Sequence, residues 1–478
     1  MKAFTVNATS RRQIIRLGAL AILGPLAVAC SQATAPATQP TTAPAAQPTA
    51  AQSSAAQPTA AAVSAAKPTA APAAAASTTK ASLEVIDSAA DPAEKKAWED
   101  QFQTFSQKNP NITIKYTPVA SDFLSKLNTM IAGGTTPDMV YIGNGDILHY
   151  AVEGAFLPLS PLMARDKFST AGLYPKIVAE YNVQGVQYAL PGDAPTQQLY
   201  INLTEYQNSK TDLPSFSWTD KTWNWDAFLK AAQNMTVRDK SGNTTKYGYQ
   251  VKTDFRSWWV WVAANGGQMF DETGTKCLLD QPAAVEAFQF LSDLIHKHKV
   301  APTVDAAQAM GGGNMFMGGN LAMATFPPWL TLMRQDVKGW QWDVCPPPAG
   351  KAGKACAGGG TGIAVGKVTK FPDQTWEYIK WRSSPEGASL WAKDAGIVSP
   401  VESVDKTDAF LQPGKPPEHI QVFLEGLNHL SADPKNLKFG EVVTVIGQEL
   451  SYVWNGTRPA QDVLTEAVKK ANVVLQQK

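Results

Sequence analysis

The sequence has few of the features that mark an enzyme, a nucleic-acid-binding protein or a protein that crosses a membrane repeatedly. Its 42 Lys and Arg nearly balance its 41 Asp and Glu, and no basic patch suggests a nucleic acid as partner. Beyond one short apolar run near the N-terminus, no segment stays apolar over the length of a membrane span. Neither a Gly-x-Ser-x-Gly elbow nor a His-Glu-x-x-His zinc motif occurs. A hydrolase of surface polysaccharides stays open as an alternative, because it needs only two carboxylates that meet in three dimensions.

Two further motifs resemble a cofactor-binding loop and a metal site, but neither has the residues or spacing that such a site requires. Residues 360–367 approach a phosphate-binding loop, but Thr361 stands where its first Gly belongs and Val368 follows the Lys. His296 and His298 are two residues apart on a predicted helix, so their side chains point away from each other. We therefore expect no catalytic residue, no cofactor and no metal site.

Cysteine is also scarce, with four residues in the chain. Cys345 and Cys356 flank a segment rich in Pro and Gly, and a disulfide between them could persist outside the cell. We predict that these two pair. The alternative is that both, together with a buried Cys277, are free thiols.

The N-terminal stretch has the composition of an export leader. Arg11, Arg12 and Arg16 precede an apolar run over residues 17–28, which suits a signal-peptide core and is too short to span a bilayer. The run closes on Ala29 and Cys30, and this end resembles a bacterial lipobox. We expect residues 1–30 to be a lipoprotein signal peptide and Cys30 to carry lipid. An ordinary signal peptide cleaved after Ala29 is the alternative.

Composition changes sharply after the leader. Residues 31–80 are almost entirely Ala, Pro, Thr, Gln and Ser. Spaced prolines block helix and sheet, and almost no large apolar side chain is available to bury, so we expect a disordered tether. Residues 81–478 number about 400, which is more than one core comfortably supports, and they predict two lobes.

Strands and helices alternate at the start of this folded part. Residues 83–86, 112–116 and 139–142 have strand patterns. Helices between them are predicted after a cap at Asp91 and after Ser121 or Asp122. The order predicts an α/β fold with parallel strands, in which ligands bind beyond the carboxyl ends of the strands.

Motifs along the whole of residues 81–478 resemble, in the same order, those of the family 1 extracellular solute-binding proteins. They lie at 98–102 and 109–112, 132–140, 154–159, 188–191 with 199–202, 223–228, 259–267, 322–324 with 328–329, 358–365 and 396–400. The resemblance implies a two-lobed, type II periplasmic-binding-protein-like α/β fold whose ligand lies in the cleft between the lobes. It places lobe 1 at about 82–193 and 362–397 and lobe 2 at about 194–361 and 398–478.

Proteins of this family serve ABC importers, mostly of sugars. A sugar offers apolar faces and a ring of hydroxyl groups, so its site needs aromatic plates together with polar groups and close backbone. The candidate ligand-binding residues with these properties are Asp91, Asn144, Asp146, Asp193, Arg256, Trp258, Trp259, Trp329, Gly360 and Thr361. We expect either Trp258 or Trp259 to lie in the cleft. Asp91 is better explained as a helix cap, and Asp193 has a turn cap as its alternative.

The resulting hypothesis is a monomeric, lipid-anchored receptor on the outer face of a bacterial cytoplasmic membrane. It would capture a carbohydrate by hinge closure, deliver it to the transmembrane subunits of an ABC permease, and touch the membrane only through its lipid. The alternatives are a surface hydrolase, an adhesion or scaffold lipoprotein, and a receptor of the same fold for a non-sugar solute.

Overall fold

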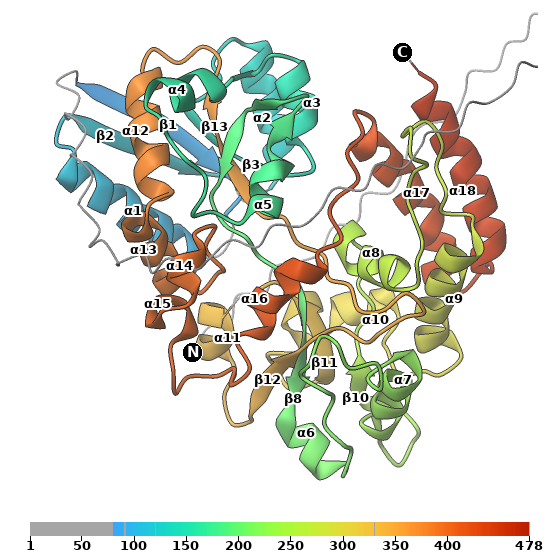
Figure 1. Ribbon diagram of the computed structural model, residues 1–478. Coiled ribbons are helices and arrows are strands. Elements are labelled where there is room, and N and C mark those ends of the chain that lie inside the picture. Colours follow the sequence, from blue (N-terminus) through green and yellow to red (C-terminus); the bar gives the residue numbers. More distant parts are fainter. Residues whose placement is uncertain (1–79, 90–91, 120, 329, 478) are drawn as a thin grey trace, which may run out of the picture. The chain divides into compact units, whose positions relative to one another are not determined.

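A computed structural model describes residues 80–89, 92–119, 121–328 and 330–477 (Figure 1). Cys30, Asp91, Trp329 and nearly all of the predicted leader and tether lie outside these described residues. The predictions for those parts therefore stay predictions.

The first sheet is built mainly from the N-terminal third of the chain. Its path runs β2-β1-β3-β13-β4, with β7 also paired to β13. The strands are β1 Ala81–Asp87, β2 Ile112–Pro118, β3 Met139–Gly143, β4 Phe156–Leu157, β7 Ala189–Pro191 and β13 Thr361–Gly366. Strand β1 is parallel to both β2 and β3, whereas β13 returns antiparallel to β3. The predicted α/β start with parallel strands is confirmed.

The second sheet uses strands from the middle of the chain, in the order β12-β8-β11-β10-β9. They are β8 Gln198–Asn202, β9 Val237–Arg238, β10 Thr244–Tyr249, β11 Leu321–Phe326 and β12 Trp342–Cys345. A separate hairpin joins β5 Asn182–Val183 to β6 Val186–Gln187. Because β7 belongs to the first sheet and β8 to the second, residues 192–197 cross between them, and residues 346–360 cross back to β13.

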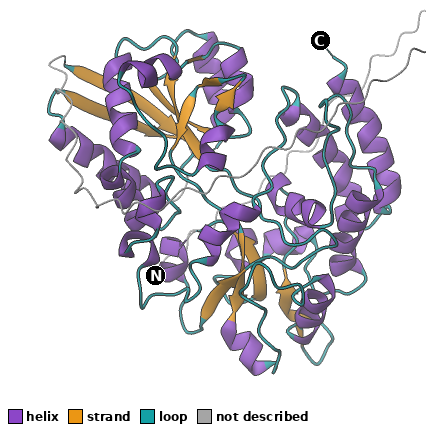
Figure 2. Cartoon of the chain, viewed as in Figure 1, coloured by secondary structure: helices purple, strands orange, loops and turns teal. Residues whose placement is uncertain are grey.

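Helices cover both sheets, as the purple and orange elements of Figure 2 show. Up to residue 264 they are α1 Pro92–Lys108, α2 Phe123–Ala132, α3 Ile147–Val152, α4 Ser160–Arg165, α5 Pro175–Glu180, α6 Leu203–Asn208, α7 Trp225–Asn234 and α8 Phe255–Ala264. Beyond it they are α9 Pro282–His296, α10 Val304–Ala309, η1 Gly312–Met315, α11 Leu330–Asp336, α12 Pro372–Arg382, α13 Pro385–Ala395, α14 Glu402–Asp405, α15 Asp408–Leu411, α16 Val422–Gly426, η2 Leu427–His429, α17 Phe439–Trp454 and α18 Ala460–Leu475.

Each sheet is the centre of one lobe of a mixed α/β, type II binding-protein fold. The second sheet shares a core with α7, α8, α9, α17 and α18. One face of the first sheet packs on α1, α12 and α13. Helices α14 and α15 contact α13, while α16 contacts β8. The exact lobe boundaries stay a prediction.

Tryptophans on helices of the first lobe serve packing, as their positions in apolar helix faces predict. Trp98, Trp376 and Trp391 are each at most 2% exposed. The rings of Trp98 and Trp391 have their centroids 3.9 Å apart, and Trp98 also meets Tyr141 of β3. Full burial of such rings removes a large apolar area from water, so this cluster ties α1 and α13 to the sheet.

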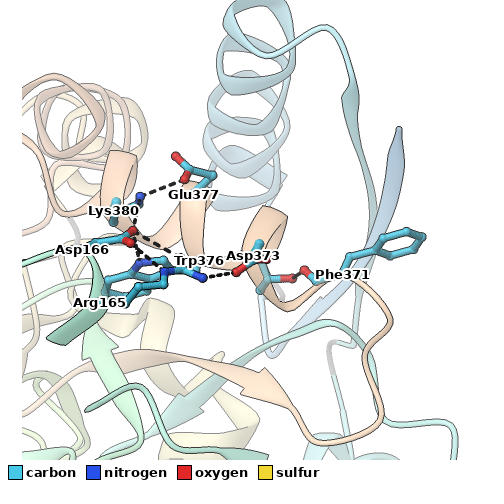
Figure 3. A network of polar contacts seen from close by, with 8 residues as sticks. Arg165, Asp166, Phe371, Asp373, Trp376, Glu377 and Lys380 are labelled. Carbon is cyan, nitrogen blue, oxygen red and sulfur yellow. Dashed lines mark hydrogen bonds and ion pairs between the residues drawn. The ribbon is translucent and has the colours of Figure 1, made fainter. Parts of the chain in front are cut away.

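A network of charges on the surface ties α4 to α12 (Figure 3). The Asp166 carboxylate accepts hydrogen bonds from Arg165, Lys380 and the indole N–H of Trp376. Arg165 also pairs with Asp373 at the start of α12. The Arg165 guanidinium and then the Lys380 ammonium lower the pKa of Asp166 below its usual range. These bonds add polar contacts between α4 and α12 to the apolar cluster that includes residues of both helices.

The disulfide that we predicted is not formed. Cys277, Cys345 and Cys356 are all free and buried. Cys345 belongs to the core of the second sheet, whereas Cys356 lies in a different apolar cluster, where its thiol donates to the Gly426 carbonyl oxygen 3.1 Å away. Proximity in sequence did not bring the two sulfurs together, because β12 carries Cys345 into the sheet interior. Among the described residues, no helix combines the length and apolar character of a membrane span.

Candidate functional site

A cavity of about 680 Å³ lies between segments of the two sheets. The first sheet and its loops contribute residues after β1, at the start of α2, and at the ends of β3 and β13. The second contributes the start of α8 and the segment after β11. The lining residues are Ser88, Asp122, Phe123, Leu124, Ser125, Tyr141, Gly143, Asp146, Asp193, Pro195, Gln197, Arg256, Pro327, Pro328, Gly358, Gly360, Thr361 and Ile397.

Five of the predicted ligand-binding residues line this one cavity. They are Asp146, Asp193, Arg256, Gly360 and Thr361. Ser88 follows β1 and Gly143 is the last residue of β3, so the cavity lies at the carboxyl ends of parallel strands, where ligands bind in this class of sheet. The structure thus brings these residues together, and their contact with a ligand stays a proposal.

Asn144 lies behind the cavity wall and connects its two sides. Its side-chain oxygen accepts a hydrogen bond from Arg256 at 2.5 Å, and its amide donates to Glu180 at 3.3 Å. The same Arg256 nitrogen pairs with Asp433 at 2.8 Å. Arg256 belongs to α8 and Asn144 to the loop after β3, so the pair bridges elements of the two sheets. Asp433, which was not predicted, comes from the loop before α17.

A clamp holds the returning strand at the opposite side of the cavity. The Asp193 carboxylate accepts the backbone N–H of Thr361 at 2.7 Å and its hydroxyl at 3.1 Å. Gly360 has a φ of +77°, and a side chain there would collide with Asp193. Only glycine allows this approach, because it has no Cβ and tolerates positive φ. Asp193 therefore orders the strand end, and burial raises the pKa of its carboxyl.

Two helices begin at the cavity with an aspartate that does not cap them. Asp122 and Asp146 are the N-cap residues of α2 and α3, yet neither carboxylate bonds to its helix. Asp122 has a φ of +53°, a left-handed conformation that costs on the order of 1 kcal/mol for a residue other than glycine. Both side chains line the cavity. Burial raises the pKa of Asp146, which Arg256 partly opposes.

The expectation that Trp258 or Trp259 reaches the cleft is wrong for this cavity. Trp258 is 1% exposed and packs on Phe288 of α9, and Trp259 is 6% exposed and stacks on Phe255. Of this run, only Arg256 lines the cavity. Trp258 projects from another face of α8, and Trp259, nearly one turn after Arg256, is held against Phe255. Trp259 instead borders a separate hollow of about 600 Å³.

The aromatic surface within the cavity comes from Phe123 and Tyr141, and a prominent rigid wall from Pro327 and Pro328. Sequence reasoning missed Phe123, Tyr141 and Gln197. The two prolines before Trp329 and the position of Phe123 at a predicted helix start were visible signals. Asp433 gave none, because its approach to Arg256 depends on the path of a distant loop.

A larger groove of about 1700 Å³ lies elsewhere, among α1, α11, α13 and the segment before α16. Its charged residues carry both signs and none of the predicted ligand-binding residues lines it. Convergence of polar groups from both sheets favours the smaller cavity as the site.

Comparisons with known proteins agree with this architecture. An arabinooligosaccharide-binding protein of Halalkalibacterium halodurans is 24% identical over 316 residues, covering 62% of this chain and 66% of that protein. A binding protein of Brucella abortus is 21% identical over 387 residues, covering 79% of this chain and 89% of its own.

Two solved structures share the fold. The ABC substrate-binding protein of Listeria monocytogenes in complex with cycloalternan superposes with a TM-score of 0.75 at 23% identity, covering 84% of this chain and all of that one. The GacH receptor of Streptomyces glaucescens gives 0.72 at 20% identity, covering 83% and 99%. The model of the family described as bacterial extracellular solute-binding protein matches residues 89–389. The chain therefore belongs to the bacterial extracellular solute-binding protein family.

Proposed function

We propose that this protein is a lipid-anchored receptor that captures a sugar or oligosaccharide in the cavity between its two sheets. One observation carries the proposal: acceptors and donors from both sheets converge on one partly apolar cavity. Sugar hydroxyl groups need both kinds of partner, and the sugar's C–H faces suit Phe123, Tyr141 and the two prolines. Trp329 directly follows Pro328, and we propose that its flat aromatic ring stacks against the sugar.

Ligand capture is proposed to work by closure of the lobes. Arg256 comes from one side of the cavity and Asp146, Asp193 and Thr361 from the other. A ligand that contacts both sides gains all its interactions only when the lobes are shut, so binding shifts the population toward the closed form. No bond is made or broken in this cycle.

Delivery to an ABC permease and anchoring through Cys30 complete the proposal. Membership of an extracellular solute-binding protein family supports a location outside the cytoplasm. A tether that keeps the receptor near its permease raises the local concentration for each encounter. The mass of the mature N-terminus checks the lipid: we expect diacylated Cys30, and an unmodified N-terminus would contradict anchoring.

A thermal-shift screen over mono- and oligosaccharides with purified protein tests the cargo. We expect a clear rise in the melting temperature with at least one saccharide, since a ligand that binds only the folded state stabilises it. A shift from another solute class, with none from any saccharide, would refute the sugar assignment. Sustained turnover of a glycan would refute the receptor assignment. Trp329→Ala is expected to weaken binding, with Trp340→Ala in the larger groove as control.

A further inference from the structure

We propose that the cavity selects its saccharide by charge, admitting uncharged and amine-bearing sugars and rejecting those that carry a carboxylate or a phosphate. This inference rests on the proposed function, and it names the class of sugar that the same cavity takes.

The charges that line the cavity are unequal in number. Asp122, Asp146 and Asp193 contribute carboxylates, and Arg256 is the single cation among the described lining residues. An anionic sugar placed here would approach three like charges in a space of about 680 Å³. Water screens the buried Asp193 and the half-buried Asp146 poorly, so they repel a nearby anion strongly, whereas Asp122 is exposed and contributes a more screened repulsion.

The one cation is already paired. Arg256 lies 2.8 Å from the Asp433 carboxylate and also donates to Asn144. Asp433 is 5% exposed, and its other carboxylate oxygen has no hydrogen-bond partner in the described chain. An anionic ligand that took Arg256 from Asp433 would leave a buried carboxylate without compensation, which is costly.

Helix ends do not reverse this balance. The N-termini of α2 and α3 carry partial positive charge, and the carboxylates of Asp122 and Asp146 stand at those ends. Neither carboxylate bonds to its own helix, so each keeps free acceptor capacity toward the cavity. The first turn of α2, whose Phe123, Leu124 and Ser125 line the cavity, has free N–H groups that can meet neutral hydroxyl oxygens without bringing in a full negative charge.

Arg382, Lys435 and Lys252 do not line the cavity, and each donates to a backbone carbonyl elsewhere. Arg382 is fully buried in α12 and donates to the Gly192 carbonyl, with its charge facing Asp193 from behind. Lys435 donates to the Ala179 carbonyl at the edge of the neighbouring loop. Arg382 offsets part of the Asp193 charge. Asp193 also accepts two hydrogen bonds from Thr361, whereas Asp122 and Asp146 make no bond to the helices that they precede, so these two are the carboxylates expected to discriminate.

The test uses matched probes that differ only at C6. Three series start from glucose, galactose and maltotriose, and each contains the neutral sugar, the derivative with a C6 carboxylate and the derivative with a C6 amine. Titration calorimetry and thermal shift at low ionic strength give the affinities. For any series that binds, we expect the carboxylate form to bind on the order of tenfold to hundredfold more weakly than the neutral form. The amine form is expected to bind at least as tightly.

The double variant Asp122→Asn/Asp146→Asn tests whether these two carboxylates cause the weaker binding of the carboxylate sugar. Neither carboxylate accepts a hydrogen bond within the described chain, so the amides keep shape without breaking a fold contact. We expect the ratio of neutral to carboxylate affinity to fall toward one. Asp462→Asn in the first turn of α18 removes an exposed acid outside the cavity, and it is expected to leave the ratio unchanged.

The outcomes separate the two proposals. A carboxylate or phosphate sugar that binds as tightly as its neutral counterpart overturns charge selection and leaves the sugar receptor standing. A discrimination that persists in the double variant overturns the role of Asp122 and Asp146. If no saccharide of any charge binds while another solute does, the proposed function itself fails.

Discussion

Two arginine–carboxylate pairs of this protein have nearly the same length and very different surroundings. Arg256 lies 2.8 Å from Asp433, with side chains 33% and 4% exposed. Arg165 lies 2.7 Å from Asp166, with side chains 48% and 22% exposed. The first pair joins elements of the two sheets at the cavity. The second joins two neighbouring residues at the end of α4, which also pair separately with Asp373 and Lys380 of α12.

Burial, and not distance, separates the consequences of breaking them. Water replaces the lost partner at an exposed pair, so such pairs contribute about 0 to 1 kcal/mol. At Asp433, removal of the arginine would leave a carboxylate shielded from water, and this costs about 3 kcal/mol or more. The same two residue types therefore contribute little to stability when the pair is exposed, and they are needed for stability when the carboxylate is buried.

The largest expected effect follows from Arg256→Ala. We expect the free energy of unfolding to fall by about 3 kcal/mol, because Asp433 is left buried without its cation. Urea unfolding followed by tryptophan fluorescence measures it. Arg165→Ala is the matched control and should cost less than about 1 kcal/mol. Equal losses in the two variants would break the comparison.

A double variant sharpens that result. Arg256→Ala with Asp433→Ala removes both charges, so stability should recover relative to Arg256→Ala alone. Absence of recovery would mean that Arg256 stabilises the fold through Asn144 or through packing, and not through Asp433.

An intermediate effect is expected at Asp405, a carboxylate that is buried without an arginine. It is 0% exposed and accepts the Ser399 N–H at 2.9 Å, and the Tyr174 hydroxyl is a second neighbour of its carboxyl group. Burial raises its pKa to about 8 from an ordinary value of 3.8. The folded protein thus holds the proton more tightly than the unfolded chain does.

Stability from this proton is full below about pH 4 and is lost as pH rises toward 8. Each pH unit in that window costs about 1.4 kcal/mol, so we expect roughly 2 kcal/mol less stability at pH 8 than at pH 6. Asp405→Asn should flatten this slope in urea unfolding at both pH values. An unchanged slope in the variant would show that other groups cause it.

The smallest effect is expected at Asp166, whose pKa is lowered in the folded protein, whereas that of Asp405 is raised. Arg165 and Lys380 lower its pKa, so its contribution is present above the ordinary value of 3.8 and is lost as pH falls below it. Asp166→Asn should cost less than about 1 kcal/mol at neutral pH, with the difference shrinking at high salt. Melting temperatures at two salt concentrations check this. A larger, salt-independent loss would show that the bond to the Trp376 indole matters more than charge.

Local patterns predicted the first part of the fold well. The strand patterns at residues 83–86, 112–116 and 139–142 predicted β1, β2 and β3. Trp98 and Trp391 were correctly taken as packing residues, since they lie on apolar helix faces. These features depend on neighbours along the chain, so a single sequence contains them.

Side-chain partners from distant segments could not be predicted in this way. Asp433 has no local signal, yet it neutralises Arg256. Trp258 and Trp259 lie beside polar residues in sequence, yet α9 and Phe255 cover them. Cys345 and Cys356 are close in the chain, yet the sheet separates their thiols.

The sequence by itself determined the α/β class, the order of its first elements and the family motifs, because periodicity and turn chemistry act over a few residues. Only the tertiary structure decided which polar groups share the cavity and which charge is already paired. Those facts depend on burial between segments far apart in the chain, and burial sets the energy of every charge at the site.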